Sequence, residues 1–223
     1  MSTVDVRDDA TDGVGQAVAA LRRGELVVLP TDTVYGLAAD AFSPPAVERL
    51  LAAKGRGRDM PVPVLVGAWR GLDGLAQHVT PEMRALVEAF WPGPLTLIVR
   101  AAPSLAWDLG ETRGTVAVRM PLHAVTLAVL AETGPLAVSS ANRSGLPPAA
   151  EVEQAVQQLG SSVAVYLDAG STGEAVASTI VDLTGDRPVV RRPGAVPTED
   201  LRALLPDLLP EAVAAPEPGQ DRA

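Results

Sequence analysis

Apolar residues along this chain recur with two periods that alternate from segment to segment. An apolar position every three or four residues predicts an amphipathic helix, and a short run rich in valine and leucine predicts a strand. Helices are expected over 14–23, 44–55, 81–90, 123–134 and 151–160. Strands are expected over 25–30, 61–67, 95–100, 114–120, 135–140, 163–170, 178–183 and 188–192. The alternation predicts one mixed α/β domain, in which a sheet of parallel and antiparallel strands is flanked by helices.

Three features of the sequence carry further expectations. The strands 178–183 and 188–192 are separated only by TGDR, which favours an antiparallel hairpin. The run PVPVLVG at 61–67 contains two prolines, which favour an edge position or irregular pairing. The polar stretch LPTDTVYGLAADAF at 29–42 is expected to be a loop between a strand and a helix.

Acidic flanks enclose this pattern. Residues 1–12 carry a net charge of −3 and are expected to be a flexible acidic N-terminus. Residues 199–223 carry −4 and are expected to form a short helix and an acidic Pro/Ala-rich tail. Of the total of −9, only −2 remains on 13–198, the expected folded domain. Such a body has no broad basic face for nucleic acid, so any positive patch must be local.

Composition excludes several classes of protein. The chain has 223 residues, of which 47% are hydrophobic, and this is enough for a sizeable core. It has no cysteine, which excludes disulfides, thiolate metal sites and a cysteine nucleophile. No apolar run reaches the roughly 18 residues of a membrane span, and the N-terminus lacks the apolar core of a secretory signal. A cytoplasmic protein without a membrane partner is expected.

The only lysine of the chain, Lys54, is followed by Arg56 and Arg58 in AAKGRGRD. A lysine before a glycine is typical of a helix C-terminus, but this leaves the two arginines unexplained. If the chain is extended after the helix, the three side chains project to one side, and the glycines between them let a ligand approach. Because three cations on one face repel each other unless an anion lies between them, we favour an anion site over a solvated turn.

Polar residues also follow two predicted strands, where ligands bind in α/β sheets. The stretch 29–42 holds three hydroxyls and a carboxylate within five residues, and PLAVSSANRSGLPP at 135–148 holds serines and an asparagine. Polar turns, with Tyr35 packed in the core, explain these residues equally well. Arg119 and Arg192 lie on strands, where an arginine is rarely buried unless an anion pairs with it.

Classical catalytic motifs are absent. The chain has no G-x-x-x-x-G-K-[ST], no complete G-x-G-x-x-G and no G-x-S-x-G, so a nucleotide site would have to be built from Arg, Lys, Ser and Asn side chains. His78 and His123 are isolated and are expected to be structural or exposed. A two-histidine metal site is not expected on this spacing.

Together these segments resemble the YrdC-like threonylcarbamoyl-AMP synthase family, in its short, single-domain form. The matching motifs occur in the family's order over roughly residues 14–197, and they are PTDTVYGLAADAF, the Lys-x-Arg of AAKGRG, FWPGPLTLIV, VAVRMP, SSANRSG, STIVDL and RRPGAV. Gly57 departs from the pattern, because the family often has proline at that place. The resemblance implies a concave fold with a central cavity.

The resemblance also implies a reaction. L-Threonine, bicarbonate or CO2, and ATP would give threonylcarbamoyl-AMP and pyrophosphate, the first step toward N6-threonylcarbamoyladenosine in tRNA. Mg2+ would accompany ATP, with no tightly bound metal held by the protein. The product would pass to a separate tRNA threonylcarbamoyl-transferase complex, and weak tRNA binding is a further expectation.

Residue roles follow from the same resemblance. Lys54 and Arg56 would be catalytic, meeting the triphosphate. The residues expected to bind ATP are Lys54, Arg56, Arg58, Thr115, Ser140, Asn142 and Arg192. The residues expected to bind threonine are Thr31, Tyr35, Arg119 and Ser178. Arg119 is a natural partner for the threonine carboxylate, and no side chain is an obvious general base.

Two other functions compete with this one. The first is a non-catalytic module for double-stranded RNA or tRNA, but a body charge of −2 and only three Trp, two Tyr and two Phe supply neither a basic stripe nor stacking platforms. The second is a carbamoyl-transfer domain like that of hydrogenase maturation proteins. Those proteins carry zinc-finger segments, which a cysteine-free chain does not have.

Overall fold

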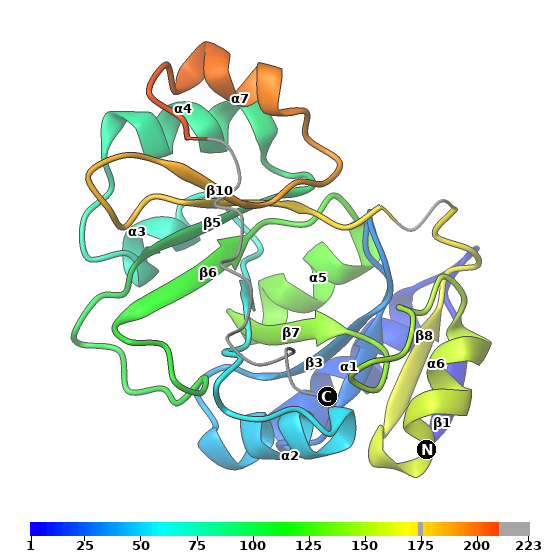
Figure 1. Cartoon of the computed structure of the whole chain (residues 1–223). Coiled ribbons are helices and arrows are strands. Elements are labelled where there is room, and N and C mark those ends of the chain that lie inside the picture. Colours follow the sequence, from blue (N-terminus) through cyan, green and yellow to red (C-terminus); the bar gives the residue numbers. More distant parts are fainter. Residues whose placement is uncertain (174–175, 210–223) are drawn as a thin grey trace, which may run out of the picture.

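A ten-stranded mixed sheet is the framework of the computed structural model, which describes residues 1–173 and 176–209 (Figure 1). Its strands are β1 (Ser2–Asp5), β2 (Val27–Leu29), β3 (Gly36–Asp40), β4 (Val64–Leu65), β5 (Leu95–Arg100), β6 (Thr115–Arg119), β7 (Leu136–Ser140), β8 (Val165–Asp168), β9 (Thr179–Asp182) and β10 (Val189–Arg192). Their order across the sheet is β1-β8-β2-β3-β7-β4-β6-β5-β9-β10. This confirms the mixed α/β class, with parallel pairs such as β1–β8 beside antiparallel pairs such as β3–β7.

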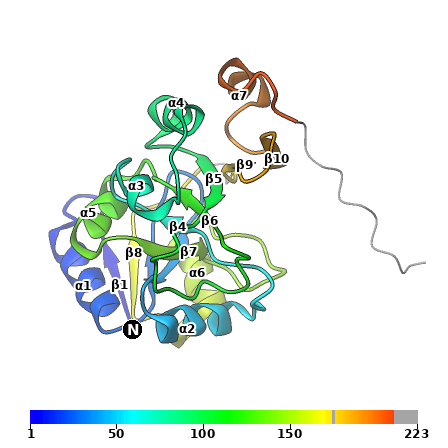
Figure 2. The ribbon, with the colours of Figure 1, turned by 90° about the vertical axis from the view of Figure 1, so that its left-hand side faces the viewer.

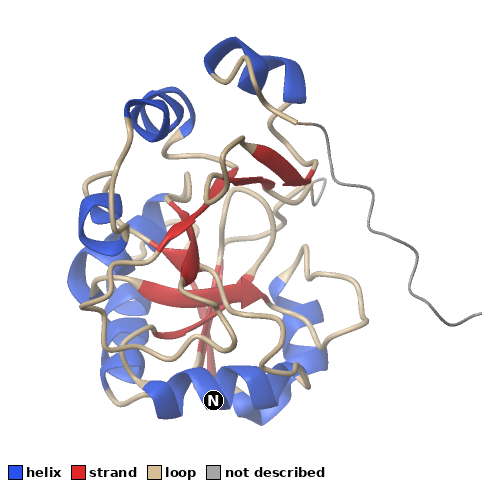
Figure 3. Ribbon diagram, turned by 60° about the vertical axis from the view of Figure 1, so that its left-hand side comes forward, coloured by secondary structure: helices blue, strands red, loops and turns tan. Residues whose placement is uncertain are grey.

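Helices lie at the periphery and the strands in the interior (Figure 3). They are α1 (Thr11–Arg22), α2 (Pro44–Lys54), α3 (Gly71–Leu75), α4 (Pro81–Phe90), α5 (Ala124–Thr133), α6 (Val152–Leu159) and α7 (Thr198–Leu204), with a 3-10 turn at Gly160–Ser162. Figure 2 shows β9 and β10 at the same end of the molecule as α4 and α7. Among the described residues, no helix has the length and apolar character that crossing a membrane requires.

The core is built on both faces of the sheet. Val27 and Leu29 of β2 pack in one apolar cluster with residues of α1 and α5, whereas Val28 between them belongs to a second, larger cluster. Successive side chains of a strand point to opposite faces, so a strand that is covered on both sides reads as a continuous apolar run. The run ELVVLP therefore marks an interior strand.

One strand lies where a loop was expected. Residues 29–42 contain β3, which pairs antiparallel with β2 on one side and β7 on the other. A side chain at Gly36 would place its Cβ 2.7 Å from Val138 Cγ1, so any larger residue at the start of β3 would require Val138 to shift. The small residues of GLAAD lack the β-branched character that identifies strands in a sequence.

The ends of the chain differ in how far they meet expectation. The prediction of a flexible N-terminus is wrong for Ser2–Asp5, because this segment pairs in parallel with β8 as an edge strand. The expected short C-terminal helix is present as α7. The predicted acidic tail falls mostly on 210–223, which lies outside the described residues.

Two other strand predictions were tested. The antiparallel hairpin is confirmed by β9 and β10. The proline-rich run forms β4, which is not at an edge but lies between β7 and β6. Pro61 and Pro63 instead leave this interior strand only two residues long, Val64–Leu65.

Candidate active site

Lys54 closes α2 and is buried, with 3% of its surface exposed. Its Nζ donates to Ser140 O at 2.5 Å, to Asn142 O at 2.7 Å and to Asn142 Oδ1 at 3.3 Å. The ammonium group thereby ties the end of α2 to the loop that follows β7. Burial, with the positive charge of Arg56, lowers the pKa of Lys54 to about 8. Lys54 is therefore a buried cation held by three acceptors and not a solvated surface lysine.

Arg56 is half-buried and reaches the same strand end. It donates to Met60 O and Pro61 O within its own loop, and its Nη1 donates to Ser139 Oγ at 3.1 Å. Burial lowers the pKa of Arg56, and the negative charge of Asp59 opposes this. Arg56 and Lys54 therefore do come together, at Ser139 and Ser140.

Arg58 does not join them. It is exposed, and its Nη2 lies 2.6 Å from Oδ1 of Asp108 in the loop between β5 and β6. The predicted row of three cations on one side of an extended segment is therefore wrong. Gly55 adopts a left-handed conformation with φ 62°, which turns the chain at the end of α2 and breaks the simple alternation.

Two other residues expected to bind ATP are engaged in local hydrogen bonds. Asn142 accepts from Lys54 and donates through Nδ2 to the carbonyls of Arg143 and Leu146. Thr115 opens β6, and its hydroxyl donates to Thr112 O at 2.8 Å. In the described residues, Asn142 thus belongs to the Lys54 cluster, whereas Thr115 has no hydrogen bond to it.

A second basic centre surrounds Arg119, at the end of β6. Its guanidinium donates from Nε to Gly93 O at 3.0 Å, from Nη1 to Thr33 Oγ1 at 3.0 Å and from Nη2 to Asp32 Oδ1 at 2.6 Å. The Arg119 and Asp32 side chains are 8% and 12% exposed. Asp32 and Thr33 were grouped with the candidate loop in the sequence but were not assigned a role, and both contact Arg119 directly.

Thr31 shapes the loop that carries these contacts. Its hydroxyl donates to Val34 O at 2.6 Å and accepts from the backbone N–H groups of Thr33 and Val34. It also lies 3.1 Å from the Thr33 hydroxyl, which accepts from Arg119. Thr31 is therefore one step removed from the guanidinium, and the polar-turn interpretation explains its hydrogen bonds.

Arg192 and Ser178 form a third group, on β10 and just before β9. Nε and Nη2 of Arg192 donate to Ser178 O, and Nη2 also donates to Ser178 Oγ at 2.9 Å. The Ser178 hydroxyl lies 2.8 Å from Thr96 Oγ1 on β5. Sequence reasoning missed Thr96, because LTLIVR reads as an ordinary strand and its partner is 82 residues away.

Tyr35 is in the core and not at the wall of a site. It has no exposed surface, and its hydroxyl donates to Gly170 O at 2.6 Å and accepts from Ala169 N at 3.0 Å. Burial raises the pKa of Tyr35 to about 12. Tyr35 therefore has no accessible surface for the expected contact with threonine. The alternative, in which Tyr35 is packed in the core, describes this residue.

The two histidines also differ from each other. His78 is exposed, as expected. His123 lies next to Leu122, whose backbone N–H donates to Asp32 Oδ1. Burial lowers the pKa of His123, and the negative charge of Asp32 opposes this. Within the described residues, His123 Nδ1 and Asp32 Oδ2 are buried without a hydrogen-bond partner. These two polar atoms near Arg119 can therefore still form hydrogen bonds.

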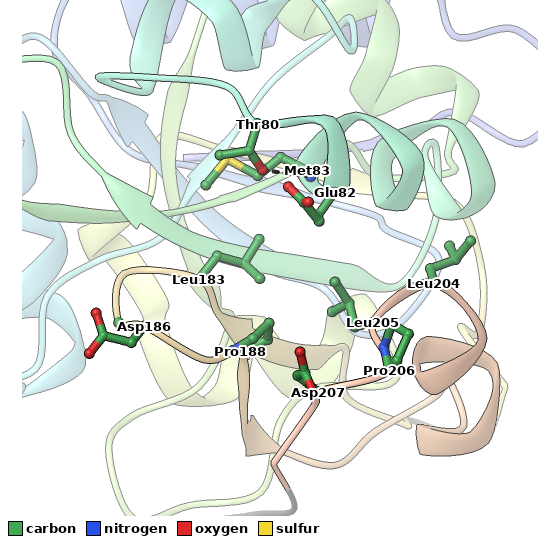
Figure 4. A pocket seen from close by; sticks show the side chains of 11 residues that line it. Thr80, Glu82, Met83, Leu183, Asp186, Pro188, Leu204, Leu205, Pro206 and Asp207 are labelled. Atoms are coloured by element: carbon green, nitrogen blue, oxygen red, sulfur yellow. Dashed lines mark hydrogen bonds between the residues drawn. The ribbon is translucent and has the colours of Figure 1, made fainter.

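A cavity of about 390 Å³ lies apart from all these groups (Figure 4). It is open to solvent on one side and is bordered by the start of α4, the turn between β9 and β10, and the segment that ends α7. Its walls are mainly apolar, with Met83, Leu183 and Leu205 among them. None of the predicted site residues lines it, so it is not the site that the basic centres build.

Comparisons with known proteins identify relatives of this chain. Residues 19–194 match the model of the Sua5/YciO/YrdC family, which is described as "Telomere recombination". A Mycobacterium tuberculosis protein, provisionally named a threonylcarbamoyl-AMP synthase, is 58% identical over 193 residues, which are 86% of this chain and 89% of that protein. The threonylcarbamoyl-AMP synthase of Bacillus subtilis is 39% identical over 208 residues, which cover 91% of this chain and 60% of the relative.

Solved structures give the same result. The crystal structure of Pyrococcus abyssi Sua5 complexed with L-threonine superposes with a TM-score of 0.90 and 33% identity. The match covers 95% of this chain but only 63% of that one, so the relative is the longer protein. By sequence over most of its length and by fold, this chain belongs to the Sua5/YciO/YrdC family.

Proposed function

We propose that this chain is a threonylcarbamoyl-AMP synthase, which condenses L-threonine, bicarbonate or CO2, and ATP into threonylcarbamoyl-AMP and pyrophosphate. Support comes from the relatives that carry this name at 58% and 39% identity, and from the L-threonine bound to P. abyssi Sua5. The observation that carries the proposal is a pair of separate basic centres. One is Arg119, at the end of β6. The other is Lys54 and Arg56, which lie at and just after the end of α2 and contact Ser140 and Ser139 of β7.

The reaction needs this kind of site. The threonine amine captures CO2 as a carbamate, whose oxygen attacks the α-phosphorus of ATP while pyrophosphate leaves. Both reactants are anions, so the protein must align them and offset their charge, and it needs little covalent chemistry of its own. Arg119 would hold the threonine carboxylate, and Lys54 with Arg56 would face the phosphates.

The unused N–H groups favour some of these cations over others for direct contact with a ligand. The three N–H groups of Lys54 match three protein acceptors, so it acts on phosphate through its charge unless the loop at Asn142 moves. Arg56, Arg119 and Arg192 each keep N–H groups without an acceptor among the described residues. These arginines are the groups that would bind the anions directly.

Mg2+ would enter with ATP. Among the described residues, no group of three or more His, Asp or Glu side chains is arranged to hold a metal ion. Asp32, the carboxylate nearest to Arg119, already accepts from the guanidinium and from Leu122 N. The metal would therefore be held mainly by the phosphates, where it offsets their charge.

The product is a mixed anhydride, which must be consumed by an acceptor before water reaches it. A separate tRNA threonylcarbamoyl-transferase complex in the cytoplasm would take it and modify adenosine. Weak contact with tRNA during this transfer is part of the same proposal.

Pyrophosphate release from Mg-ATP tests the reaction. We expect release only when threonine and bicarbonate are both present, together with threonylcarbamoyl-AMP in the products. Release that continues without threonine would indicate a different ATP reaction. A folded protein that releases nothing under the full conditions would overturn the proposal, and tRNA binding would then be measured in its place.

A further inference from the structure

Thr96 and Ser178 form a buried pair of hydroxyl groups between two parallel strands. Thr96 lies on β5 and Ser178 directly precedes β9, and the two strands pair with Leu95 opposite Thr179. Their oxygen atoms are 2.8 Å apart, and the residues are 4% and 6% exposed. A valine has nearly the same shape as threonine, so the hydroxyl at this apolar strand position calls for an explanation.

Among the described residues, only one of the two hydroxyl hydrogens of the pair has an acceptor. The two hydroxyls have two hydrogens, and one of them is used between Thr96 and Ser178. Arg192 Nη2 donates to Ser178 Oγ at 2.9 Å. In this bond Ser178 accepts a hydrogen from Arg192, so neither of the two hydroxyl hydrogens is used. One hydroxyl hydrogen is therefore left without an acceptor.

The charge on Arg192 indicates which hydrogen is left. A hydroxyl that accepts from a cation becomes a stronger donor, and hydrogen bonds in a chain reinforce one another. Ser178 therefore donates to Thr96, and the hydrogen of Thr96 remains free. The result is a donor chain that runs from Arg192 through Ser178 to Thr96.

The surroundings favour a negatively charged acceptor. Gly93, three residues before Thr96, accepts from Arg119 Nε, and Thr96 is linked to Arg192 through Ser178. Burial lowers the pKa of Arg119, Asp32 opposes this, and the positive charge of Arg192 adds to the lowering. Two guanidinium groups and one carboxylate leave one positive charge in excess, beside donors that have no acceptor.

We propose that Thr96 is a further ligand-binding residue, whose hydroxyl donates to an oxyanion held between Arg119 and Arg192. The inference rests on the proposed function, which supplies two oxyanions of suitable kind. One is the carboxylate of threonine and the other is a phosphate of ATP. Both are acceptors of strong hydrogen bonds from hydroxyl and guanidinium groups.

Thr96→Val removes the hydroxyl and keeps the shape of the side chain, and Thr96→Ser keeps the hydroxyl. Thr133→Val is a matched control, because the Thr133 hydroxyl donates only to backbone carbonyls near the end of α5. Each variant is compared with the parent protein by thermal unfolding. Pyrophosphate release then gives KM for threonine, bicarbonate and ATP in turn, and calorimetry measures binding of L-threonine and of inorganic pyrophosphate as separate probes.

We expect Thr96→Val to raise KM, and Kd for the corresponding probe, by about tenfold for one anionic substrate. Thr96→Ser should remain within about threefold of the parent, and Thr133→Val should leave all three KM values unchanged. A change confined to threonine identifies the carboxylate, and a change confined to ATP and pyrophosphate identifies a phosphate. Unchanged KM and Kd in a folded Thr96→Val protein would overturn the proposal, as would a defect that Thr96→Ser does not rescue.

The two binding measurements test this inference independently of the proposed function. A parent protein that binds a probe but releases no pyrophosphate would refute the synthase reaction, and the Kd values would still test Thr96. A folded parent protein that binds neither probe would overturn the oxyanion site itself.

Discussion

Arg119 donates from Nη2 to Asp32 Oδ1 at 2.6 Å, and the two side chains are 8% and 12% exposed. Breaking such a buried pair on one side leaves a charge without a partner in a poorly solvated place, which costs about 3–5 kcal/mol. We predict that Asp32→Asn and Arg119→Met each lower the free energy of unfolding by roughly this amount. The double variant should lose clearly less than the sum of the two, and urea unfolding measures this coupling.

The exposed pair Arg84–Asp73 is the control for this cycle. Its side chains are 42% and 41% exposed, and exposed pairs contribute about 0–1 kcal/mol. Removing Asp73 should therefore change stability little. Equal losses from the buried and the exposed pair would show that burial does not set the strength of the Arg119–Asp32 contact.

Lys54 should make stability depend on pH in the alkaline range. Its pKa is lowered from 10.5 to about 8 in the folded protein, so between these values the unfolded chain binds a proton that the folded protein has released. Stability rises with pH wherever the unfolded state binds more protons. We therefore expect the parent protein to gain stability relative to Lys54→Met as pH rises from about 8 to 10.

Urea unfolding of both proteins at pH 7, 8, 9 and 10 measures the difference. The raised pKa values of Tyr35 and Tyr166 act at the upper end of this range, but they are common to both proteins and cancel. A constant difference across the series would mean that the hydrogen bonds from Lys54 to Ser140 and Asn142 keep its pKa near the ordinary value.

Much of this fold could be predicted from local patterns. The proline at the start of α2 and the glycine after Lys54 marked both of its ends, and the apolar runs marked most strands. The strand β3 was missed because Gly36–Asp40 has small residues, which fit a close approach to β7 but have no strand propensity. Strand order could not be predicted, because it depends on contacts between distant segments.

The candidate site could also be predicted only in part from the sequence. Arg119 was recognisable, because a buried arginine that ends an apolar strand needs an anionic partner. The same rule selected Arg192, but this residue is exposed and contacts the neutral Ser178. Their actual partners were not recognisable, since Asp32 and Ser178 meet them only through the folding of the sheet. Arg58 was misplaced because the left-handed turn at Gly55 changes the direction of the chain, and a rule for extended segments then fails.

Tyr35 provides a test of the corrected site. Its hydroxyl bridges Gly170 O and Ala169 N, and both bonds are lost in Tyr35→Phe. We predict a loss of about 1–3 kcal/mol in the free energy of unfolding, because buried backbone groups are left without partners. KM for threonine should stay within about twofold of the parent value. A KM for threonine that rises with no loss of stability would contradict this prediction and indicate that Tyr35 contacts threonine.

Arg58 and Asp108 allow a last prediction about ATP. Their contact of 2.6 Å is exposed, and Asp108 Oδ1 also accepts from Gly110 N. If Arg58 binds ATP as the resemblance implies, Asp108 weakens this binding, because its carboxylate occupies one N–H of the guanidinium and its negative charge repels a phosphate. Asp108→Asn should therefore lower KM for ATP by about two- to fivefold, and Arg58→Ala should raise it.

The salt dependence distinguishes this effect of Asp108 from a structural effect. An exposed ion pair is screened by salt, so the advantage of Asp108→Asn should shrink between about 0.05 M and 0.5 M sodium chloride. In the double variant, the substitution at Asp108 should have a smaller effect on KM, because no guanidinium remains for the carboxylate to occupy. If Asp108→Asn instead raises KM for ATP while thermal unfolding is unchanged, the ion pair holds Arg58 in its working position, and Asp108 is a positioning residue for ATP.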